Sequence, residues 1–442
     1  MQKFFSLLCA VLLLAGCDGL VVVPNDKTIS KEEVEEIEEV EEIEEVEEVE
    51  EVEEVEEVEE IEEVEEIEEV EEIEETEEVE EVEVEAKGPI KIGFIGPLSG
   101  EAVSIGITVQ NVVRMYVAEK NSQGGIKGRQ IEVDWQDGKC KGAEANSVAN
   151  YLLNQAKVNL IVGGACSGET LAAAELTEAK KAILFSTAST NPRIKEAGNF
   201  VFRSVPSDSS QGKVLARYAK GQGYKAVGVL YEQTDYASGI FKAFEAEAKR
   251  IGLTVVDPEK FATDESNFSN RITKLKNNTE IEALLIAVES LPKFEIIAQK
   301  ITELKFKKPL LLNDVIIGGE PEKIKLYDTL FAGESAKAVG ANFRAPEGRK
   351  LTDFLAKYKE AYGRDPEYLN YAASTADGMG ILLTALEQVP DVANTTKVRD
   401  TLSKIEYEGL LGQLSFDQDG EIVGVEYSIF EYGDLATGFS VK

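Results

Sequence analysis

Apolar and polar positions follow two different periods from residue 90 onward. Residues 90–95 form an apolar run typical of a buried strand, and the Gly/Pro/Ser-rich loop at 96–100 follows directly. The next segment has apolar side chains at helical spacing, at Val109, Val112, Val113, Tyr116 and Val117. Gly124-Gly125 would end this helix, and the alternating residues 131–135 predict a second strand.

Strand and helix patterns continue to alternate along the rest of the chain, which predicts an α/β fold with parallel sheets covered by helices. The expected strands lie at 158–162, 183–185, 200–203, 226–231, 253–256, 283–288 and 309–312. A new run of elements begins at Asp208, so we expect two lobes. The apolar helices at 351–362 and 371–386 have no sheet of their own, and we expect them to cover the first lobe.

The N-terminus has the zones of a secretory signal, with Lys3 followed by an apolar run at 4–14 that is too short to span a bilayer. The sequence Leu14-Ala15-Gly16-Cys17 resembles the bacterial lipobox. This implies removal of residues 1–16, lipid on Cys17 and a lipidated N-terminus at 17–31. Asp18 resembles the inner-membrane retention signal of two-membrane bacteria. We expect a lipid-anchored protein on the periplasmic or extracellular face of the membrane, and a soluble exported protein with an incidental Cys17 is the alternative.

Residues 32–86 form an acidic low-complexity segment that repeats Glu-Glu-Val or Glu-Glu-Ile. It contains 36 glutamates, and without them the formal net charge changes from −38 to −2. A period of three matches neither helix nor strand, and like charges crowd at helical spacing. We therefore expect a solvated tether between lipid and domain. An acidic arm that binds Ca²⁺ weakly or docks on a basic surface is the alternative.

Cysteine and histidine usage limits the chemistry. Cys9 would leave with the signal and Cys17 would carry lipid, so Cys140 and Cys166 remain as one possible disulfide pair, with two separate buried thiols as the alternative. The sequence has no histidine, which excludes Ser/His/acid triads, Cys/His pairs and His-ligated metals. It also lacks the glycine-rich phosphate-binding motifs. We expect no enzyme, no metal or other cofactor and no nucleic-acid partner.

One short acidic segment, Asp417-Gln418-Asp419-Gly420, resembles the start of a calcium-binding loop. Its glycine comes too early for such a loop, and no glutamate occupies the required later position. We therefore expect a turn here.

Three loops that follow predicted strands have polar or small residues suited to a zwitterion. In open α/β sheets, ligands bind beyond the carboxyl ends of the strands. The loops at 163–168 and 186–192 supply small residues and hydroxyls, which suit a carboxylate at a helix N-terminus. Asp314 follows the third strand and could pair with an ammonium group. Ordinary turns and helix caps are the alternative for each loop taken alone.

Several motifs follow one another in order: Gly-Pro-Leu-Ser-Gly at 96–100, residues 121–128, the Cys-Ser loop at 166–167, Ser189-Thr190-Asn191-Pro192, Ser209-Ser210-Gln211-Gly212, and Phe416-Asp417 with Asp419-Gly420. With these motifs, the chain from about residue 90 to the C-terminus resembles the type I periplasmic binding proteins of the Leu/Ile/Val family, which serve ABC importers for branched-chain amino acids and related compounds. The resemblance implies two αβα lobes joined by crossovers near Pro206, Val339 and Phe416. Lobe 1 would hold 87–207 and 339–416, and lobe 2 would hold 208–338 and 417–442. It also implies a disulfide between Cys140 and Cys166 beside the ligand.

The same resemblance assigns roles to individual residues. It implies that Ser167 binds the ligand carboxylate, Thr190 contacts both carboxylate and amine, and the Ala188 carbonyl receives the amine. Tyr236 would close over the ligand from the second lobe, with a packing tyrosine as the alternative, and Asp314 would bind the ammonium.

Two positions depart from the family pattern and bear on specificity. Ile105 stands where an aromatic residue is common in branched-chain amino acid binders, and Glu289 stands near an expected tyrosine. Glu289 is either a solvated charge or a group that reads a polar or cationic ligand side chain. Leucine-type specificity is therefore not expected from these positions.

We expect a solute-binding lipoprotein that captures an amino acid, or a related small zwitterion or amide, and delivers it to the permease of an ABC importer. A ligand-sensing lipoprotein that signals to a receptor or kinase is the alternative. A hydrolytic enzyme that uses Asp314 and Glu289 as an acid/base pair is a remote one.

Overall fold

The computed structural model describes residues 22–23, 27–28, 88–319, 330, 337–433 and 439–442. The chain divides into two units, Met1–Glu81 and Val82–Lys442. In the first unit, β1 (Val22–Val23) and β2 (Lys27–Thr28) pair antiparallel. The expected signal peptide, Cys17 and the acidic tether lie outside the described residues. Within the described part of the chain, every helix is too short or too polar to cross a lipid bilayer.

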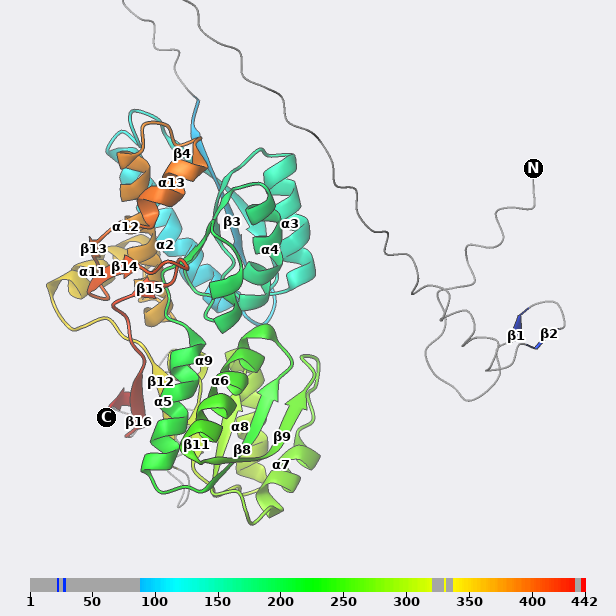
Figure 1. The fold of residues 1–442 in the computed structure, drawn as a ribbon. Helices are drawn as coiled ribbons and strands as arrows, with labels where there is room; N and C mark the ends of the chain where they lie inside the picture. The colour runs from blue at the N-terminus through cyan, green and yellow to red at the C-terminus, as the bar shows by residue number, and fades with distance from the viewer. Residues whose placement is uncertain (1–21, 24–26, 29–87, 320–329, 331–336, 434–438) are drawn as a thin grey trace, which may run out of the picture. The chain divides into compact units, whose positions relative to one another are not determined.

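Five parallel strands form the sheet of the first lobe (Figure 1). In sheet order they are β4 (Ile131–Asp137), β3 (Ile90–Gly96), β5 (Leu160–Gly163), β6 (Ile183–Ser186) and β7 (Val201–Arg203). Ile92 and Phe94 of β3 belong to one core cluster, while Ile95 belongs to a second cluster on the opposite face. Because both faces are buried, a strand of this sheet has apolar residues at successive positions.

Helices cover both faces of the first sheet. On one side lie α3 (Gly142–Asn154) and α4 (Ser167–Ala179), and on the other lie α2 (Val103–Ser122) and α12 (Leu369–Gln388). The predicted apolar stripe of α2 is buried at Val109, Val112, Val113 and Val117, and Tyr116 is partly buried.

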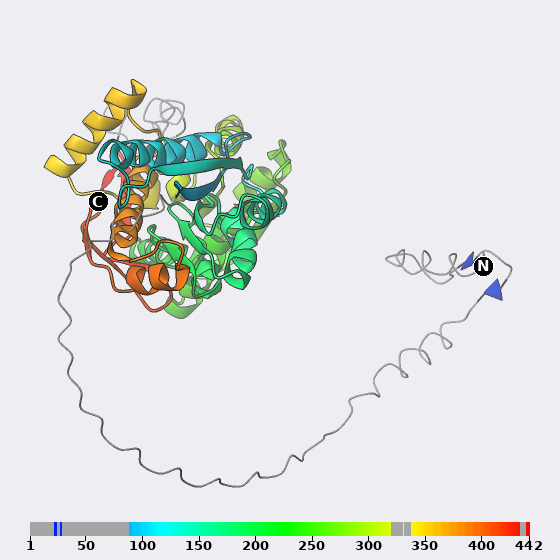
Figure 2. The ribbon, with the colours of Figure 1, turned by 90° about the horizontal axis from the view of Figure 1, so that it is seen from above.

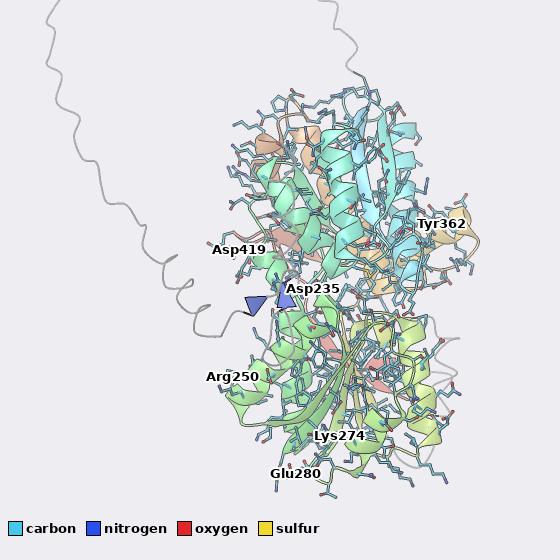
Figure 3. All side chains as sticks on the ribbon, turned by 90° about the vertical axis from the view of Figure 1, so that its right-hand side faces the viewer. Asp235, Arg250, Lys274, Glu280, Tyr362 and Asp419 are labelled. Atoms are coloured by element: carbon cyan, nitrogen blue, oxygen red, sulfur yellow. A yellow bond between two sulfur atoms is a disulfide. The ribbon has the colours of Figure 1, made fainter. Side chains whose placement is uncertain are left out.

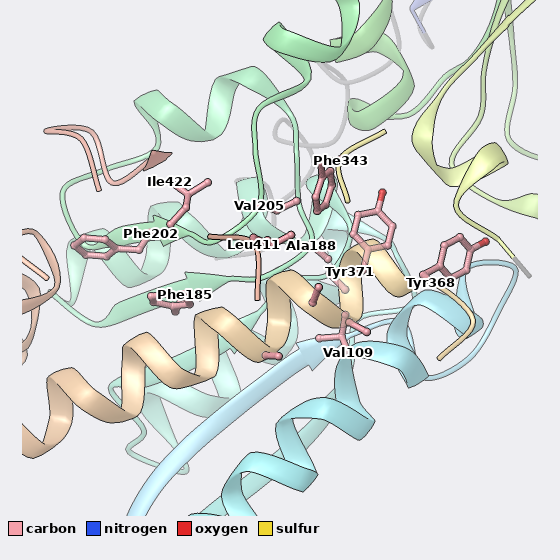
Figure 4. Packing of buried hydrophobic residues seen from close by; sticks show 14 of the residues in the cluster. Val109, Phe185, Ala188, Phe202, Val205, Phe343, Tyr368, Tyr371, Leu411 and Ile422 are labelled. Atoms are coloured by element: carbon pink, nitrogen blue, oxygen red, sulfur yellow. The ribbon is translucent and has the colours of Figure 1, made fainter. Parts of the chain in front are cut away.

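The late helices return to this lobe, as expected from their lack of a sheet. Helix α12 packs on α2 and β6, α11 (Arg349–Tyr362) packs on α2, and α13 (Thr395–Leu402) packs on β6 and α12. Figure 2 shows α2 with the late helices on the same side of the molecule. The core cluster between them includes Phe185, Ala188 and Tyr371 (Figure 4).

The second lobe is built on a seven-stranded sheet. In sheet order its strands are β17 (Phe439–Val441), β16 (Ser428–Tyr432), β12 (Ala338–Asn342), β11 (Leu310–Leu312), β10 (Ala283–Ala287), β8 (Ala226–Glu232) and β9 (Thr254–Phe261). The strands from β12 to β9 are parallel, whereas β16 and β17 add an antiparallel edge. Its helices are α5 (Asp208–Gly221) and α6 (Asp235–Ile251) on one face, and α7 (Ser269–Asn277) and α8 (Leu291–Glu303) on the other.

Three chain passages connect the two sheets, and two of them lie later in the sequence than the resemblance implies. Residues 338–342 pair along β11 and β16, so the second passage follows Asn342 instead of Val339. The third passage follows Val423 instead of Phe416. The reason is that β15 (Ile422–Val423) turns back to pair with β14 (Gln413–Phe416), which also pairs with β13 (Tyr407–Glu408).

The turn that reverses the chain is the segment 417–420, as predicted. The Asp417 carboxylate accepts hydrogen bonds from the N–H groups of Asp419 at 2.9 Å and Glu421 at 3.0 Å. Glu421 in turn forms an isolated parallel bridge with Arg203, so the small sheet is fastened to the end of β7.

Candidate ligand-binding cleft

The loop after β5 is fixed by one buried carboxylate, Glu169, beneath the start of α4. Glu169 accepts hydrogen bonds from the N–H groups of Cys140 at 2.9 Å, Cys166 at 3.0 Å and Ala165 at 3.1 Å. Burial raises the pKa of Glu169 to about 7, although the three donors oppose this shift. The fixed loop presents Ser167 as the first residue of α4, where a helix N-terminus attracts anions.

Cys140 and Cys166 are placed as a disulfide, which joins the loop after β4 to the residue before Ser167. Their Cα atoms lie 5.2 Å apart, and 26 positions separate them in the sequence. A carboxylate oxygen of Glu289, from the second lobe, lies within 4.8 Å of both sulfur atoms. The disulfide therefore lies where the two lobes meet.

Two hydroxyls of the loop after β6, those of Ser186 and Ser189, bond within the first lobe. Ser186 and Ser189 donate to the Gly164 carbonyl oxygen at 2.9 and 2.8 Å. These two side chains stabilise the neighbouring loop, because both hydroxyl hydrogens are used in bonds to Gly164. Ser167 differs, because its Oγ accepts from the Asn191 N–H at 3.2 Å and its own hydrogen is left to donate.

Thr190 faces Asp208 and does not line the cavity described below. Its hydroxyl donates to Oδ2 of Asp208 at 2.8 Å, and its carbonyl oxygen accepts from the Asp208 N–H at 2.8 Å. Asp208 is the first residue of α5, directly after the first passage between the lobes. Burial raises the pKa of Asp208, and the nearby Asp314 adds to this effect.

Asp314 begins α9 (Asp314–Ile317) after β11, and it is fully buried. Its Oδ1 accepts hydrogen bonds from the Tyr236 hydroxyl and from the Val315 N–H at 3.1 Å. Its Oδ2 accepts from the hydroxyls of Tyr371 at 3.0 Å and Tyr427 at 3.3 Å. Burial raises the pKa of Asp314, while these donors oppose the shift. The carboxylate thus lies behind a layer of tyrosines.

A small cavity of about 20 Å³ lies between the lobes, at the carboxyl ends of strands from both sheets. Its walls come from both lobes, and they are Ile105, Ala165, Cys166, Ser167, Ala188, Tyr236, Glu289, Val315 and Tyr371. Five of the seven residues expected at the ligand are among them. The two exceptions are Thr190 and Asp314, which lie one layer further from the cavity for the reasons given above.

Three lining residues are not predicted from the sequence. Ala165 and Val315 each adjoin a motif that draws attention to its more polar neighbours, Cys166-Ser167 and Asp314. Tyr371 comes from α12, whose apolar pattern indicates only a covering helix. A tyrosine at the first turn of that helix is the signal that could identify it.

The rims of the cleft carry polar contacts between the lobes. On one rim, Arg193 pairs with Asp235 at 3.3 Å, and Figure 3 labels Asp235 at the junction of the lobes. In a second contact between the lobes, Ser290 donates to the Glu101 carboxylate at 3.3 Å, and Lys293 lies 3.8 Å from the same carboxylate. A cavity of this size holds about one water molecule. The lobes are therefore closed around this cavity.

A larger hollow, of about 440 Å³, lies where the short 3-10 helix η1 (Pro192–Glu196) meets α5 and α6. Its wall includes the exposed side chains Lys242 and Arg250 and contains none of the residues expected at the ligand. The cavity between the lobes fits ligand capture better, because both sheets direct their strand ends toward it.

Comparison with known proteins agrees with this architecture. The family model for periplasmic binding proteins matches residues 89–434. The chain is 25% identical to the leucine-, isoleucine-, valine-, threonine- and alanine-binding protein of Pseudomonas aeruginosa, over 80% of this chain and 92% of the relative. It is 24% identical to the Leu/Ile/Val-binding protein of Escherichia coli K12, over 80% of this chain and 93% of that protein.

A solved structure of a related protein has the same fold. The substrate-binding protein of a branched-chain amino acid transporter from Streptococcus pneumoniae, in complex with isoleucine, superposes with a TM-score of 0.68 at 26% identity, covering 80% of this chain and 99% of that one. These relatives are solute-binding proteins and not enzymes. The chain therefore belongs to the periplasmic binding protein family, with the type I fold of the substrate-binding proteins of branched-chain amino acid transporters.

Proposed function

We propose that this protein captures an amino acid, or a related small zwitterion or amide, between its two lobes and delivers it to the permease of an ABC importer. The supporting observation is the cavity at the strand ends, whose walls come from both lobes and include the N-terminal residue of α4. Solute enters while the lobes are apart, and contacts from both lobes then favour the closed form. Relatives whose names state amino-acid binding support the same ligand class.

Each polar group of the cleft has a proposed part. Ser167 and the first N–H groups of α4 bind the ligand carboxylate, and the Ala188 carbonyl oxygen accepts from the ammonium. Tyr236 closes over the ligand, and Asp314 supplies negative charge from behind its hydroxyl. Thr190 lies in the same layer as Asp314, behind the cavity wall, where its hydroxyl donates to Asp208. Ile105 contacts the ligand's apolar part.

The proposed location follows from the N-terminal sequence alone. Cys17 carries the lipid that holds the protein at the outer face of the cell membrane, which is the inner membrane in a two-membrane cell. Labelling cells with a radioactive fatty acid tests this, because Cys17→Ser should remove the label while the cleft residues remain unchanged.

A thermal-shift screen of amino acids and small amides tests the binding role. A ligand that binds only the folded protein raises stability by about 2.7 kcal/mol at one hundred times its Kd. Ser167→Ala should abolish the shift, because it removes a lining hydroxyl at the α4 N-terminus. The matched control is Ser147→Ala, whose exposed hydroxyl bonds only to the Ala143 carbonyl oxygen in its own helix, α3. A full response of the Ser167 variant would contradict the proposed site.

A further inference from the structure

Glu289 is the only residue with an ionisable carboxylate or cationic side chain among the described residues that line the cavity. It lies two positions after β10, directly before Ser290, the N-cap of α8. Its carboxylate approaches the Cys140–Cys166 disulfide of the opposite lobe within 4.8 Å. The Glu289 carboxylate of the second lobe therefore lies at the contact between the two lobes.

The groups that face Glu289 are mostly acids. The Glu289 N–H donates to Oε2 of Glu232 at 2.8 Å, and Glu232 is itself 3% exposed. Burial raises the pKa of Glu289, and the charges of Glu232, Glu169 and Asp235 raise it further, whereas a hydrogen bond from Thr234 lowers it. The carboxylates of this group come from both lobes, because Glu169 belongs to α4.

The nearby cations are engaged with other groups. The positive charge of Lys293 lowers the pKa of Glu232. Its Nζ, however, donates to the carbonyl oxygens of Thr263 at 2.6 Å and Glu265 at 3.2 Å. Arg193 pairs with Asp235 at the rim. A carboxylate that is enclosed by closing lobes needs a counter-charge or a proton, because burying an unpaired charge is costly.

The apolar lining beside Glu289 suits a hydrocarbon stem. Ile105 contributes from the first lobe and Val315 from the second, and both are buried aliphatic side chains. A ligand side chain with methylene groups and a terminal cation would contact these residues and then reach the carboxylate. The α-ammonium would contact the Ala188 carbonyl oxygen, and Asp314, behind the Tyr236 hydroxyl, adds negative charge from the neighbouring strand end.

Building on the proposed function, we infer that Glu289 binds a positive charge on the ligand side chain, so that the captured solute is a cationic amino acid with an aliphatic stem and a terminal ammonium group. Glu289 then binds the side-chain cation, while the Ala188 carbonyl oxygen accepts from the α-ammonium. A branched aliphatic amino acid would leave Glu289 enclosed with no counter-charge.

Calorimetric titration of the full chain with L-lysine and with L-norleucine, its uncharged analogue, tests this inference. Lysine should bind at least about tenfold more tightly than norleucine. Glu289→Gln should remove this preference, whereas Glu245→Gln, on the exposed face of α6, should preserve it. Tighter binding of norleucine, or an unchanged preference in Glu289→Gln, would overturn the inference.

The pH dependence provides a second readout. If Glu289 binds a cation, protons compete with the ligand, so lysine affinity should fall as the pH is lowered through the raised pKa of Glu289. A neutral ligand bound beside protonated Glu289 would instead bind more tightly at the lower pH, and that result overturns the inference. If amino acids bind without charge preference, the proposed function stands and this inference fails. If neither an amino acid nor a related small zwitterion or amide binds, both fail.

Discussion

Asp314 and Tyr371 connect the two lobes directly behind the cleft. The Tyr371 hydroxyl donates to Oδ2 of Asp314 at 3.0 Å. Tyr371 belongs to α12 of the first lobe, Asp314 begins α9 of the second, and both side chains are buried. Because Tyr371 also lines the cavity, lobe closure and ligand contact depend on the same side chain.

Tyr371→Phe should weaken ligand binding without unfolding the protein. The substitution removes one hydrogen bond between the lobes, worth about 1–1.5 kcal/mol, and keeps the ring that packs in the core. We expect affinity to fall about five- to tenfold in calorimetric titration. Tyr362→Phe is the control, because its hydroxyl bonds to the Asn111 carbonyl oxygen within the first lobe. Equal losses in the two variants would exclude a specific role for the contact between the lobes.

Glu169 should make folding stability depend on pH. Its pKa in the folded protein is about 7, above its ordinary value of 4.5. The folded state therefore binds the Glu169 proton more tightly than the unfolded state does. The contribution of Glu169 to folding stability is fully present below about pH 4.5 and is lost as the pH rises through about 7. The shift corresponds to at most about 3 kcal/mol.

Urea denaturation of Glu169→Gln at a series of pH values checks this. Between about pH 4.5 and 7, the free energy of unfolding of the variant should depend less steeply on pH than that of the wild type, because glutamine does not titrate there. Identical slopes in the two proteins would show that the Glu169 carboxylate has an ordinary pKa in the folded protein. The neighbouring acid Glu175 on α4 provides a matched control, since its side chain is exposed.

The elements that the sequence predicts well are those with long apolar runs or a clear helical period. The strand at 90–96 is apolar because both its faces are buried, and α2 has a full apolar stripe. The shorter strands β12 and β16 are not marked by either pattern. Residues 338–342 are mostly small, and their pairing with β11 and β16 depends on partners far away in the chain. This is why the second passage between the lobes lies later than expected.

The same distinction applies to the cleft. Ser167, Ala188 and Glu289 follow strands closely, and the general rule for ligands in open α/β sheets identifies such positions. That rule cannot decide whether a side chain points into the cavity or into the layer behind it. The bond from Thr190 to Asp208 and the tyrosines around Asp314 form only when the lobes and the passages between them come together.

Replacing both Cys140 and Cys166 by serine should lower stability and affinity together. Loss of a crosslink across a segment of this length costs about 3.5 kcal/mol in the chain-entropy account. The disulfide also fixes the residue before Ser167, so the variant should bind ligand more weakly. Denaturant titration and calorimetry measure the two effects, and thiol labelling of the unfolded wild-type protein checks the disulfide itself. Two freely reactive thiols, or an unchanged unfolding midpoint, would contradict the crosslink.

Deleting the acidic segment at 32–86 should leave ligand affinity unchanged. Its 36 glutamates account for nearly all of the net charge, and its period of three offers no apolar face with which to join a folded domain. If the segment acts as a tether between lipid and domain, deletion should shorten the distance from the membrane to the lobes. Energy transfer from a labelled membrane to a dye on an exposed lobe residue measures that distance, and calorimetry on the same variant measures affinity. A deletion of the same residues that lowered affinity strongly would instead show that the acidic segment takes part in ligand capture.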